Sequence, residues 1–484
     1  MAKKILIIDD DYLVLKTIDK YLKSYGYNIE TAQSGMQALE KVKKDIFDLI
    51  ISDVRMPGMD GVETLKRIKE LTTSRTKKRI PVIVITGYVG KDDIYENAEE
   101  LGVVKCIYKP FDSEEFIETV KKNLDFTPVY QKEISIDYKP LNESFLSLVA
   151  NFREYLKKTK EKFDNFDKLH SEKMQRIHFL ELQKEEIVSD LAKYFKNIWN
   201  TAKSLGTNEY NSYAHYLREK ANDLFIHSGR INDYIFKKPL GYPGDFVMMN
   251  YIFDYYKDTY LGDSSYEMFL NHLACNVPIS RSNIKRKDYF KKKLIEVIDS
   301  KKGAKILSVG SGSSRELIEL LKEGRIKNNF YFHCLDFEEK ALQYVEKELS
   351  EIDPDKKKYC EIEYTKKNLL NLVKDRKSTG LHKEYDFIYC SGVFDYLKDR
   401  VATRLVNILF NHLVKNGTLI FCAANNKDGF YRVSYEMMGD WVFNHREKEE
   451  LIKWLQDIKD KAKVNFEDIS DKTNYSFLNI KKLS

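Results

Sequence analysis

The sequence predicts an α/β protein in which two parallel, doubly wound sheets are separated by a helical segment. Short apolar runs alternate with amphipathic stretches over residues 1–124, and the same alternation returns from Lys305. Between them, leucine, phenylalanine and tyrosine recur every three or four residues. The first pattern is typical of strands alternating with helices, and the second of amphipathic helices. We therefore expect three parts, residues 1–124, 125–284 and 285–484.

The composition favours a globular protein that does not bind nucleic acid. Lysine and arginine exceed aspartate and glutamate by 81 − 75 = +6, and charges of both signs are interspersed, as on a solvated surface. The six cysteines show no paired spacing of the kind that binds a metal. The amino terminus has no signal-peptide pattern, and no run approaches about 18 apolar residues. We expect a soluble, cytoplasmic protein with reduced thiols and no transmembrane segment.

Polar residues follow the apolar runs of the first part. Asp9 and Asp10 follow "KILII", Asp53 follows "DLIIS", Thr86 ends "PVIVIT" and Lys109 follows "KCIY". Since the carboxyl ends of parallel strands share one edge of a sheet, these side chains are expected to converge. Three adjacent carboxylates indicate a divalent cation, and Mg²⁺ prefers oxygen ligands. Asp53 would then attack a phosphoryl group, with Lys109 and Thr86 stabilising its oxygens; helix capping explains only one of the aspartates.

Four motifs of this first part, "IIDDD", "IISDVRMPGMDG", "VIVITG" and "YKPF", resemble the response-regulator receiver domain in order and spacing. The resemblance implies a flavodoxin-like sheet and a sensor histidine kinase or phosphotransfer protein as partner. It implies that Asp53 is the phosphoacceptor and that Thr86 and Lys109 contact the phosphoryl group. It also implies that Mg²⁺ is bound by Asp9, Asp10 and Asp53.

Residues 125–284 are expected to form a helical connector and a substrate cap. Within them, "KPLGYPGDFVMMNYIFDYY" places a glycine- and proline-rich turn between two helical stretches. Tyr242 and Asp245 give this turn polar side chains. The turn is either a substrate loop or an ordinary turn whose aspartate caps the next helix. The helical segment is also a candidate element for forming a homodimer.

The last part contains five apolar, strand-like runs, followed by two strands joined by the short connection "SDKTN", which predicts an antiparallel pair. After the first run, "GSGSSR" lacks the lysine of a phosphate loop and has Arg315 where a dinucleotide loop has its third glycine. A nucleoside without a pyrophosphate fits better. Gly310 and Gly312 would admit it, and Asp336, at the end of the next strand, would accept bonds from the ribose hydroxyls.

These features resemble the class I S-adenosylmethionine-dependent methyltransferases, over residues 285–484, which implies a Rossmann-like seven-stranded sheet. In this sequence Ser308 replaces the acidic residue common just before the glycine loop of that family. By position, the resemblance implies that Gly310, Ser311 and Gly312 of the glycine loop contact the cofactor and that Asp336 binds its ribose. It also implies that Asn368 lies near the adenine and that Ser391 lies at the opening through which the substrate enters.

Three further motifs, "KPLGYPGDFVMMNYI", "VPISRSNIKRKDYF" and "LSVGSGSSREL", resemble the extracellular-factor family, the methyltransferases of 3-hydroxypalmitic acid methyl ester biosynthesis. That resemblance implies methylation of a fatty or other small carboxylic acid. A carboxylate is already a nucleophile, so alignment and desolvation suffice for the transfer. Tyr242, Arg281 and Arg286 are the candidate substrate contacts, since a guanidinium can bind both carboxylate oxygens.

The prediction for the whole chain is a two-component response regulator whose output is a carboxyl O-methyltransferase. Two alternatives stay open. One is a phosphorelay adaptor whose output domain binds S-adenosylmethionine without catalysis, and the other is a protein methyltransferase.

Overall fold

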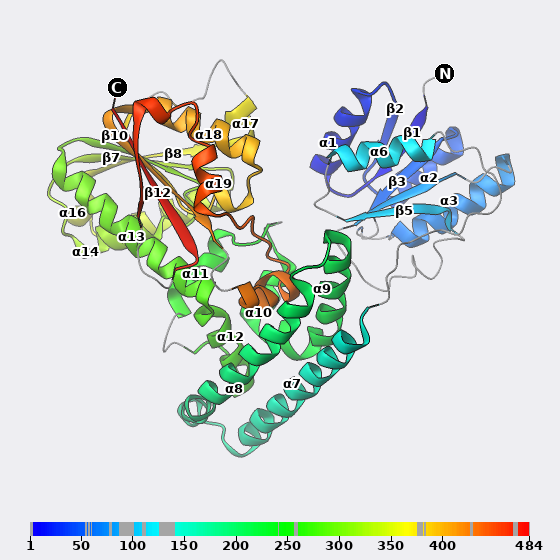
Figure 1. Cartoon of the computed structure of the whole chain (residues 1–484), viewed down its shortest axis with the longest axis horizontal. Coiled ribbons are helices and arrows are strands. Elements are labelled where there is room, and N and C mark those ends of the chain that lie inside the picture. Colours follow the sequence, from blue (N-terminus) through cyan, green and yellow to red (C-terminus); the bar gives the residue numbers. More distant parts are fainter. Residues whose placement is uncertain are drawn as a thin grey trace. The chain divides into compact units, whose positions relative to one another are not determined.

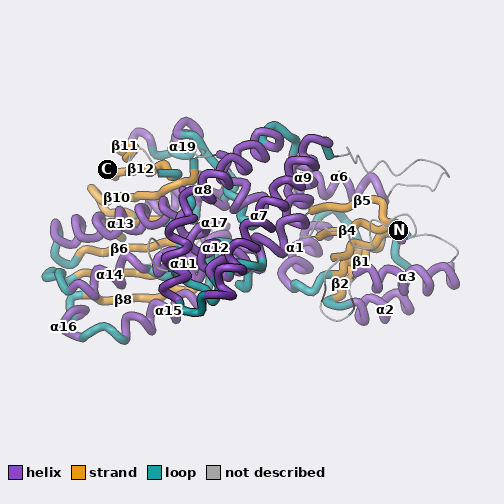
Figure 2. Tube along the Cα trace, turned by 90° about the horizontal axis from the view of Figure 1, so that it is seen from below, coloured by secondary structure: helices purple, strands orange, loops and turns teal. Residues whose placement is uncertain are grey.

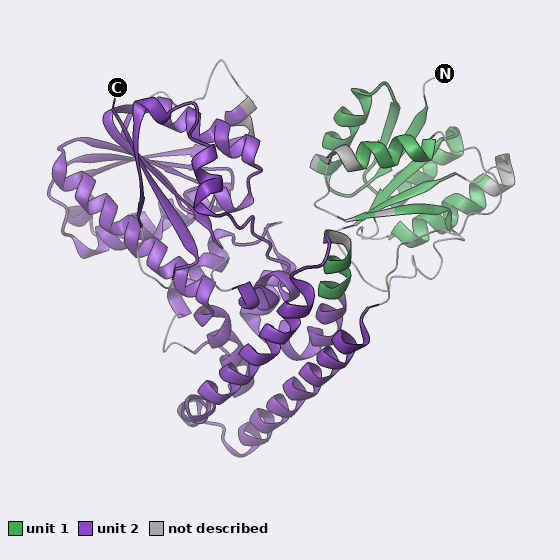
Figure 3. Cartoon of the chain, viewed as in Figure 1, with its two compact units in different colours: residues 1–141, 207–215 green, residues 142–206, 216–484 purple. Residues whose placement is uncertain are grey.

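The computed structural model describes residues 3–53, 56, 59, 61–76, 80–86, 101–108, 113–124, 141–240, 242–255, 260–374, 381, 384–425, 429–467 and 473–483. The chain divides into two compact units (Figures 1 and 3). The first comprises Met1–Leu141 and Thr207–His215, and the second Asn142–Gly206 and Tyr216–Ser484. Among the described residues, no helix has both the length and the apolarity needed to cross a membrane.

The first unit contains a sheet of five parallel strands in the order β2-β1-β3-β4-β5. The strands are β1 (Lys4–Ile8), β2 (Asn28–Ala32), β3 (Leu49–Asp53), β4 (Val82–Thr86) and β5 (Val103–Tyr108). The described helices are α1 (Tyr12–Lys23), α2 (Gly35–Lys44), α3 (Gly61–Thr76) and α6 (Ser113–Leu124).

Helices cover both faces of this sheet, because side chains alternate along each strand. In β1, Leu6 and Ile8 belong to a core that includes α2 and α3, whereas Ile5 and Ile7 belong to one that includes α1 and α6. The predicted flavodoxin-like, doubly wound sheet is thereby confirmed.

The second unit begins with helices. They are α7 (Glu143–Leu169), α8 (Lys173–Ala202), α9 (Thr207–Ala221), α10 (Arg230–Lys237), α11 (Phe246–Tyr255), α12 (Ser265–Asn276) and α13 (Pro278–Ser300). Of α9, the residues Thr207–His215 belong to the first unit and the rest to the second. The helices α7 and α8 lie side by side, and α12 packs against both (Figure 1). Apolar residues at helical spacing form the buried stripe of α7, among them Val149, Phe152 and Leu156. The last helix, α13, runs through the predicted boundary at residue 285 and packs against the second sheet.

The second sheet has seven strands in the order β11-β12-β10-β9-β6-β7-β8 (Figure 2). Its strands are β6 (Ala304–Val309), β7 (Phe330–Asp336), β8 (Cys360–Lys366), β9 (Tyr385–Cys390), β10 (Leu413–Ala424), β11 (Ala462–Glu467) and β12 (Tyr475–Lys482). Five strands are parallel, and β12 is antiparallel to both β10 and β11. The sheet is therefore mixed, with the antiparallel pair that the chain's last strands predicted.

Helices also flank this sheet. They are α14 (Arg315–Glu323), α15 (Glu339–Ser350), α16 (Pro354–Lys357), α17 (Leu369–Lys374), α18 (Asp399–Asn411) and α19 (Lys448–Lys453). One face packs against α17, α18 and α19 around Trp454. On the other face, Phe290 of α13 lies against Tyr389 and Phe477, with ring centroids 4.9 and 6.0 Å apart. The carboxyl ends of β6, β7 and β9 meet at one edge, where a ligand of such a sheet binds.

Candidate functional site

Three carboxylates gather at the strand ends of the first unit. The register pairs Ile8 of β1 with Ser52 of β3, so the next residues, Asp9 and Asp53, are neighbours. Asp9 is buried, Asp53 half-buried and Asp10 exposed. One carboxylate oxygen from each lies within 4.8 Å of the other two. This spacing allows a single hard cation to contact all three.

The local hydrogen bonds distinguish this cluster from helix capping. Asp9 Oδ1 accepts the backbone N–H of Asp11 (2.9 Å). The carboxylate at the start of α1 belongs to Asp11, which accepts the N–H of Val14 (3.4 Å). Capping of α1 therefore does not require Asp9, Asp10 or Asp53.

The two other predicted residues of this site are described in part or not at all. Thr86 is the last residue of β4, directly after Ile85, which pairs with Asp53. Its backbone therefore lies beside the acidic cluster. Lys109 lies outside the described residues.

Comparison with known proteins agrees with this geometry. Residues 5–121 match the response regulator receiver domain. Sporulation initiation phosphotransferase F of Bacillus subtilis is 40% identical over 124 residues, which are 26% of this chain and 95% of that protein. The chain belongs to the response-regulator receiver family.

Two further comparisons cover a similar share of the chain. The transcriptional regulatory protein ZraR of Escherichia coli is 39% identical over 123 residues, 25% of this chain and 26% of ZraR. This chain therefore spans about a quarter of ZraR's length. A solved response regulator receiver domain protein (CheY-like) from Methanospirillum hungatei is 29% identical and covers 26% of this chain and 95% of its own, with a TM-score of 0.24. Each of these three matches covers about a quarter of this chain.

The glycine loop of the second unit joins β6 to α14. The N–H groups of Gly310 and Ser311 donate to the Leu335 carbonyl of β7 (2.8 and 3.2 Å), which fixes the loop beside that strand. Gly310 and Gly312 have positive φ angles of 64° and 51°. A Cβ on Gly310 would lie 2.4 Å from Cγ2 of Val393, whereas one on Gly312 would have no atom within 4 Å. Gly310 is therefore needed for packing, and Gly312 faces open space.

Asp336, the last residue of β7, is buried beside this loop. Its Oδ2 accepts the N–H of Gly312 (2.8 Å), and its Oδ1 accepts the N–H of Glu338 (2.9 Å). Burial raises the pKa of Asp336, and these backbone N–H groups oppose the rise. Each carboxylate oxygen keeps a lone pair for a further donor.

The predicted turn between α10 and α11 lies over the same edge of the sheet. The ring centroids of Tyr242 and Phe337 are 5.0 Å apart. Burial, followed by the charge of Asp336, raises the pKa of the Tyr242 hydroxyl. Asp245 accepts bonds from Tyr234 Oη (3.0 Å) and from the N–H of Met248 (2.9 Å). Asp245 therefore caps α11, as the simpler interpretation predicted, while Tyr242 lies near the proposed ribose-binding acid.

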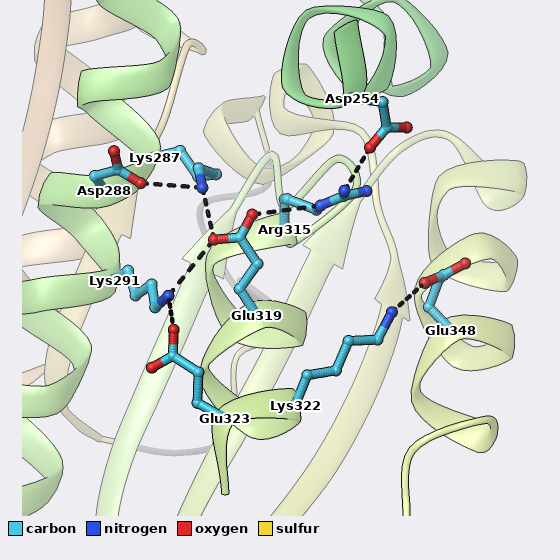
Figure 4. Close-up of polar contacts among 9 residues, drawn as sticks. All are labelled: Asp254, Lys287, Asp288, Lys291, Arg315, Glu319, Lys322, Glu323 and Glu348. Atoms are coloured by element: carbon cyan, nitrogen blue, oxygen red, sulfur yellow. Dashed lines mark hydrogen bonds and ion pairs between the residues drawn. The ribbon is translucent and has the colours of Figure 1, made fainter. Parts of the chain in front are cut away.

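An ion-pair network joins α11 to the glycine loop and to α13 (Figure 4). Arg315, the first residue of α14, pairs with Asp254 of α11 and with Glu319 (Nε–Oε1 3.5 Å). Glu319 in turn accepts a bond from Lys287 of α13 (2.6 Å). Arg315, the residue that argued against a dinucleotide loop, thus connects α11 to the glycine loop.

The other residues predicted to contact the substrate or the cofactor differ in how exposed they are. Arg281 is exposed, whereas Arg286, five residues later on α13, is only 6% exposed. These two side chains therefore do not form one clamp. Ser391 is half-buried directly after β9, and Asn368 is exposed. The N–H of Lys367 donates to the Asp336 carbonyl (2.7 Å), which places Asn368 close to the end of β7.

Two aromatic residues at the strand ends were missed by the sequence interpretation. Phe337 is 45% exposed and directly follows Asp336. Tyr396 is 41% exposed after β9, and its hydroxyl accepts a bond from Trp441 Nε1 (2.7 Å). A Cβ on Gly244 would lie 2.8 Å from that hydroxyl, so the turn that carries Tyr242 also contacts Tyr396. An aromatic directly after a strand-end aspartate was the signal available in the sequence.

These groups fit a nucleoside cofactor with an extended polar tail. The space at Gly312 leaves room for it, Asp336 offers lone pairs to ribose hydroxyls, and Phe337 offers an exposed ring face. Ser311 Oγ is buried and has no hydrogen-bond partner among the described residues. An orphaned hydroxyl in the glycine loop is the kind of group that a ligand satisfies.

Proposed function

We propose that the chain is a response regulator phosphorylated on Asp53 by a sensor histidine kinase or phosphotransfer protein. The observation that supports this is the carboxylate cluster in a receiver domain. Magnesium, when bound by Asp9, Asp10 and Asp53, supplies positive charge next to the phosphoryl oxygens. An Asp53 oxygen attacks phosphorus, the bond to the donor breaks, and the donor keeps its electron pair. Thr86 and Lys109 donate to the phosphoryl oxygens.

Acetyl phosphate with Mg²⁺ tests this proposal, since a small phosphodonor needs no kinase. We expect the wild type to be labelled and Asp53→Asn not to be, because an amide cannot form an acyl phosphate. Asp19→Asn, whose partly exposed carboxylate pairs with Lys23 on α1, is the matched control and should be labelled normally. Equal labelling of Asp53→Asn would show that another residue is the acceptor.

We further propose that the second unit is an S-adenosylmethionine-dependent methyltransferase. The geometry of the glycine loop supports it, because Asp336 is held by the N–H of Gly312 where the loop faces open space. The cofactor would supply a methyl group on a sulfonium. In this proposal Asp336 binds the ribose hydroxyls, Phe337 and Asn368 lie on the adenine side, and Gly312 admits the cofactor's tail.

Calorimetry with S-adenosylmethionine tests the cofactor site. Asp336→Ala is expected to weaken binding by roughly 2–3 kcal/mol, because a charged acceptor for two hydroxyls is lost. Glu339→Ala is the matched control, since this exposed carboxylate pairs with Lys366 two residues before Asn368 and is expected to leave affinity unchanged. No binding by the wild type would exclude the cofactor.

The methyl acceptor that we propose is a fatty or other small carboxylic acid. A carboxylate oxygen attacks the methyl carbon, the carbon–sulfur bond breaks, and sulfur keeps the electron pair, so no base is required. Tyr242 and the exposed Arg281 are the candidate contacts of its carboxylate. Ser391 would lie at the mouth.

The acceptor class is tested by incubating the protein with methyl-labelled cofactor and cell extract and separating lipid from protein. Base-labile label in the lipid fraction would support a methyl ester. Label in polypeptide would indicate a protein methyltransferase instead. Cofactor binding without any transfer would indicate a binding domain that acts as an adaptor.

A further inference from the structure

A buried charge pair, Arg286 and Asp395, lies beside the glycine loop, and neither of the proposed reactions uses it. Arg286 of α13 places its guanidinium 4.6 Å above the Tyr475 ring. Its Nη1 is 3.9 Å from Oδ2 of Asp395, a residue that is 1% exposed. Oδ1 of Asp395 accepts the N–H of Ala424 (2.6 Å), but Oδ2 has no hydrogen-bond partner among the described residues.

This arrangement leaves one buried acceptor, Asp395 Oδ2, and one buried donor, Asn283 Nδ2, without a hydrogen-bond partner among the described residues. A separation of 3.9 Å is too long for a hydrogen bond, so the pair attracts without completing its bonds. Asn283, one turn before Arg286, accepts a bond from the Tyr475 hydroxyl at its Oδ1 (2.9 Å), while its buried Nδ2 has no partner among the described residues. A buried carboxylate oxygen and a buried amide are costly when unpaired. A ligand with one cationic donor and one anionic acceptor would satisfy both.

Burial raises the pKa of Asp395, and the charge of Arg286 opposes that rise. The cation thus offsets part of the effect that burial has on this carboxylate. Because Arg286 already faces Asp395, a ligand carboxylate at Arg286 is favoured only when the same ligand brings a cation for Asp395, which a simple acid does not.

The strand order places this pair where the far end of a nucleoside cofactor would lie. β9 pairs with β6, and Val393 contacts Gly310 of the glycine loop. A ligand whose ribose is held by Asp336 at β7 passes over β6 and next reaches the turn after β9. Strands are about 4.8 Å apart, so this path is about 10 Å long. Ser308 of β6 is neutral, and the carboxylate nearest to that end of the ligand is therefore sought in the β9 turn.

We propose that Asp395, Arg286 and Asn283 form a receptor for the α-amino-acid head of the cofactor. The Asp395 Oδ2 accepts from the α-ammonium, and Arg286 and Asn283 donate to the α-carboxylate. This inference rests on the proposed cofactor and assigns to the β9 turn the acidic contact that Ser308 lacks.

The test compares two nucleosides that differ in this head. S-adenosylhomocysteine carries the amino-acid head, and 5′-methylthioadenosine lacks it. By calorimetry, Asp395→Asn is expected to weaken binding of the first roughly 10- to 100-fold, since a bond to a charged group is lost, and to leave binding of the second unchanged. The asparagine keeps an acceptor for the Ala424 N–H, and retained methylthioadenosine binding reports an intact fold.

Asp336→Asn is expected to weaken both ligands together, because both carry the ribose. An equal loss of both ligands in Asp395→Asn, or a loss of neither, would overturn the receptor. If the wild type binds methylthioadenosine but not adenosylhomocysteine, the receptor is also wrong while the nucleoside site stands. If the wild type binds neither, the proposed cofactor is wrong and the receptor falls with it.

Discussion

Gly310 and Gly312 of the glycine loop are expected to respond differently to replacement by alanine, Gly310→Ala mainly by losing stability and Gly312→Ala mainly by losing ligand binding. Both have positive φ angles, which cost an L-residue about 1–2 kcal/mol, and alanine recovers about 0.4–1 kcal/mol by restricting the unfolded chain. Only Gly310→Ala adds a collision, with its Cβ 2.4 Å from Val393, which costs about 1–3 kcal/mol more. We expect unfolding free energies to fall by about 1 kcal/mol in Gly312→Ala and about 2–4 kcal/mol in Gly310→Ala.

Tryptophan fluorescence during urea unfolding is the appropriate measurement. The three tryptophans, Trp199, Trp441 and Trp454, all lie in the second unit, so the signal reports that unit and not the receiver domain. Adding Val393→Ala to Gly310→Ala removes the side chain that the new Cβ would meet. The double variant is therefore expected to be less destabilised than the sum of the two single variants predicts.

Binding of the proposed cofactor is expected to be affected in the reverse order, more by Gly312→Ala than by Gly310→Ala. A Cβ on Gly312 enters the space that the proposed cofactor occupies, so Gly312→Ala should abolish S-adenosylhomocysteine binding while remaining folded. Gly310→Ala should retain binding at temperatures where it is folded. The reasoning is refuted if Gly312→Ala binds normally, or if the two variants lose equal stability.

The remaining predictions concern the cap and the buried thiols. Asp254→Asn removes one of the two charged partners of Arg315 and is expected to lower the unfolding free energy by less than about 1 kcal/mol, because the pair is partly exposed; urea unfolding measures it. Phe337→Ala is expected to weaken nucleoside binding roughly 10-fold through loss of an aromatic face, and calorimetry would show no change if the ring is outside the site. Burial raises the pKa of the Cys422 thiol to about 12, so at pH 8 this residue should react with a thiol reagent only as fast as the unit unfolds; rapid labelling of Cys422 itself, located by peptide mapping, would contradict this burial.

The receiver domain could be predicted almost entirely from the sequence, because its signals are local. Each strand is a short apolar run, and the polar residue that follows it must lie at the shared edge of a parallel sheet. Asp9 and Asp53 are far apart in the chain, yet a single register between β1 and β3 makes them neighbours. The glycine loop and Asp336 could be predicted for the same reason, since β6 and β7 are adjacent.

The buried charge pair could not be predicted, because its partners come from distant segments. In the sequence, Arg286 lies in a run of lysines and arginines, a pattern that usually indicates solvated surface. Residues five positions apart on a helix differ by about 140° in direction, since 3.6 residues make a turn. Arg281 and Arg286 therefore could not share one clamp once both lay on α13. The burial of Arg286 also depends on Tyr475 and Asp395, whose positions only the complete sheet fixes.

The same limit applies to Arg315, although the sequence identified it as important. Its place in "GSGSSR" argued against a pyrophosphate, because a bulky side chain stands where a dinucleotide loop needs a glycine. The structure gives that side chain a positive role, since Arg315 leaves the loop and reaches Asp254 on α11. The turn that carries Tyr242 immediately precedes α11. Arg315 thus both argues against a pyrophosphate at the glycine loop and connects that loop to α11.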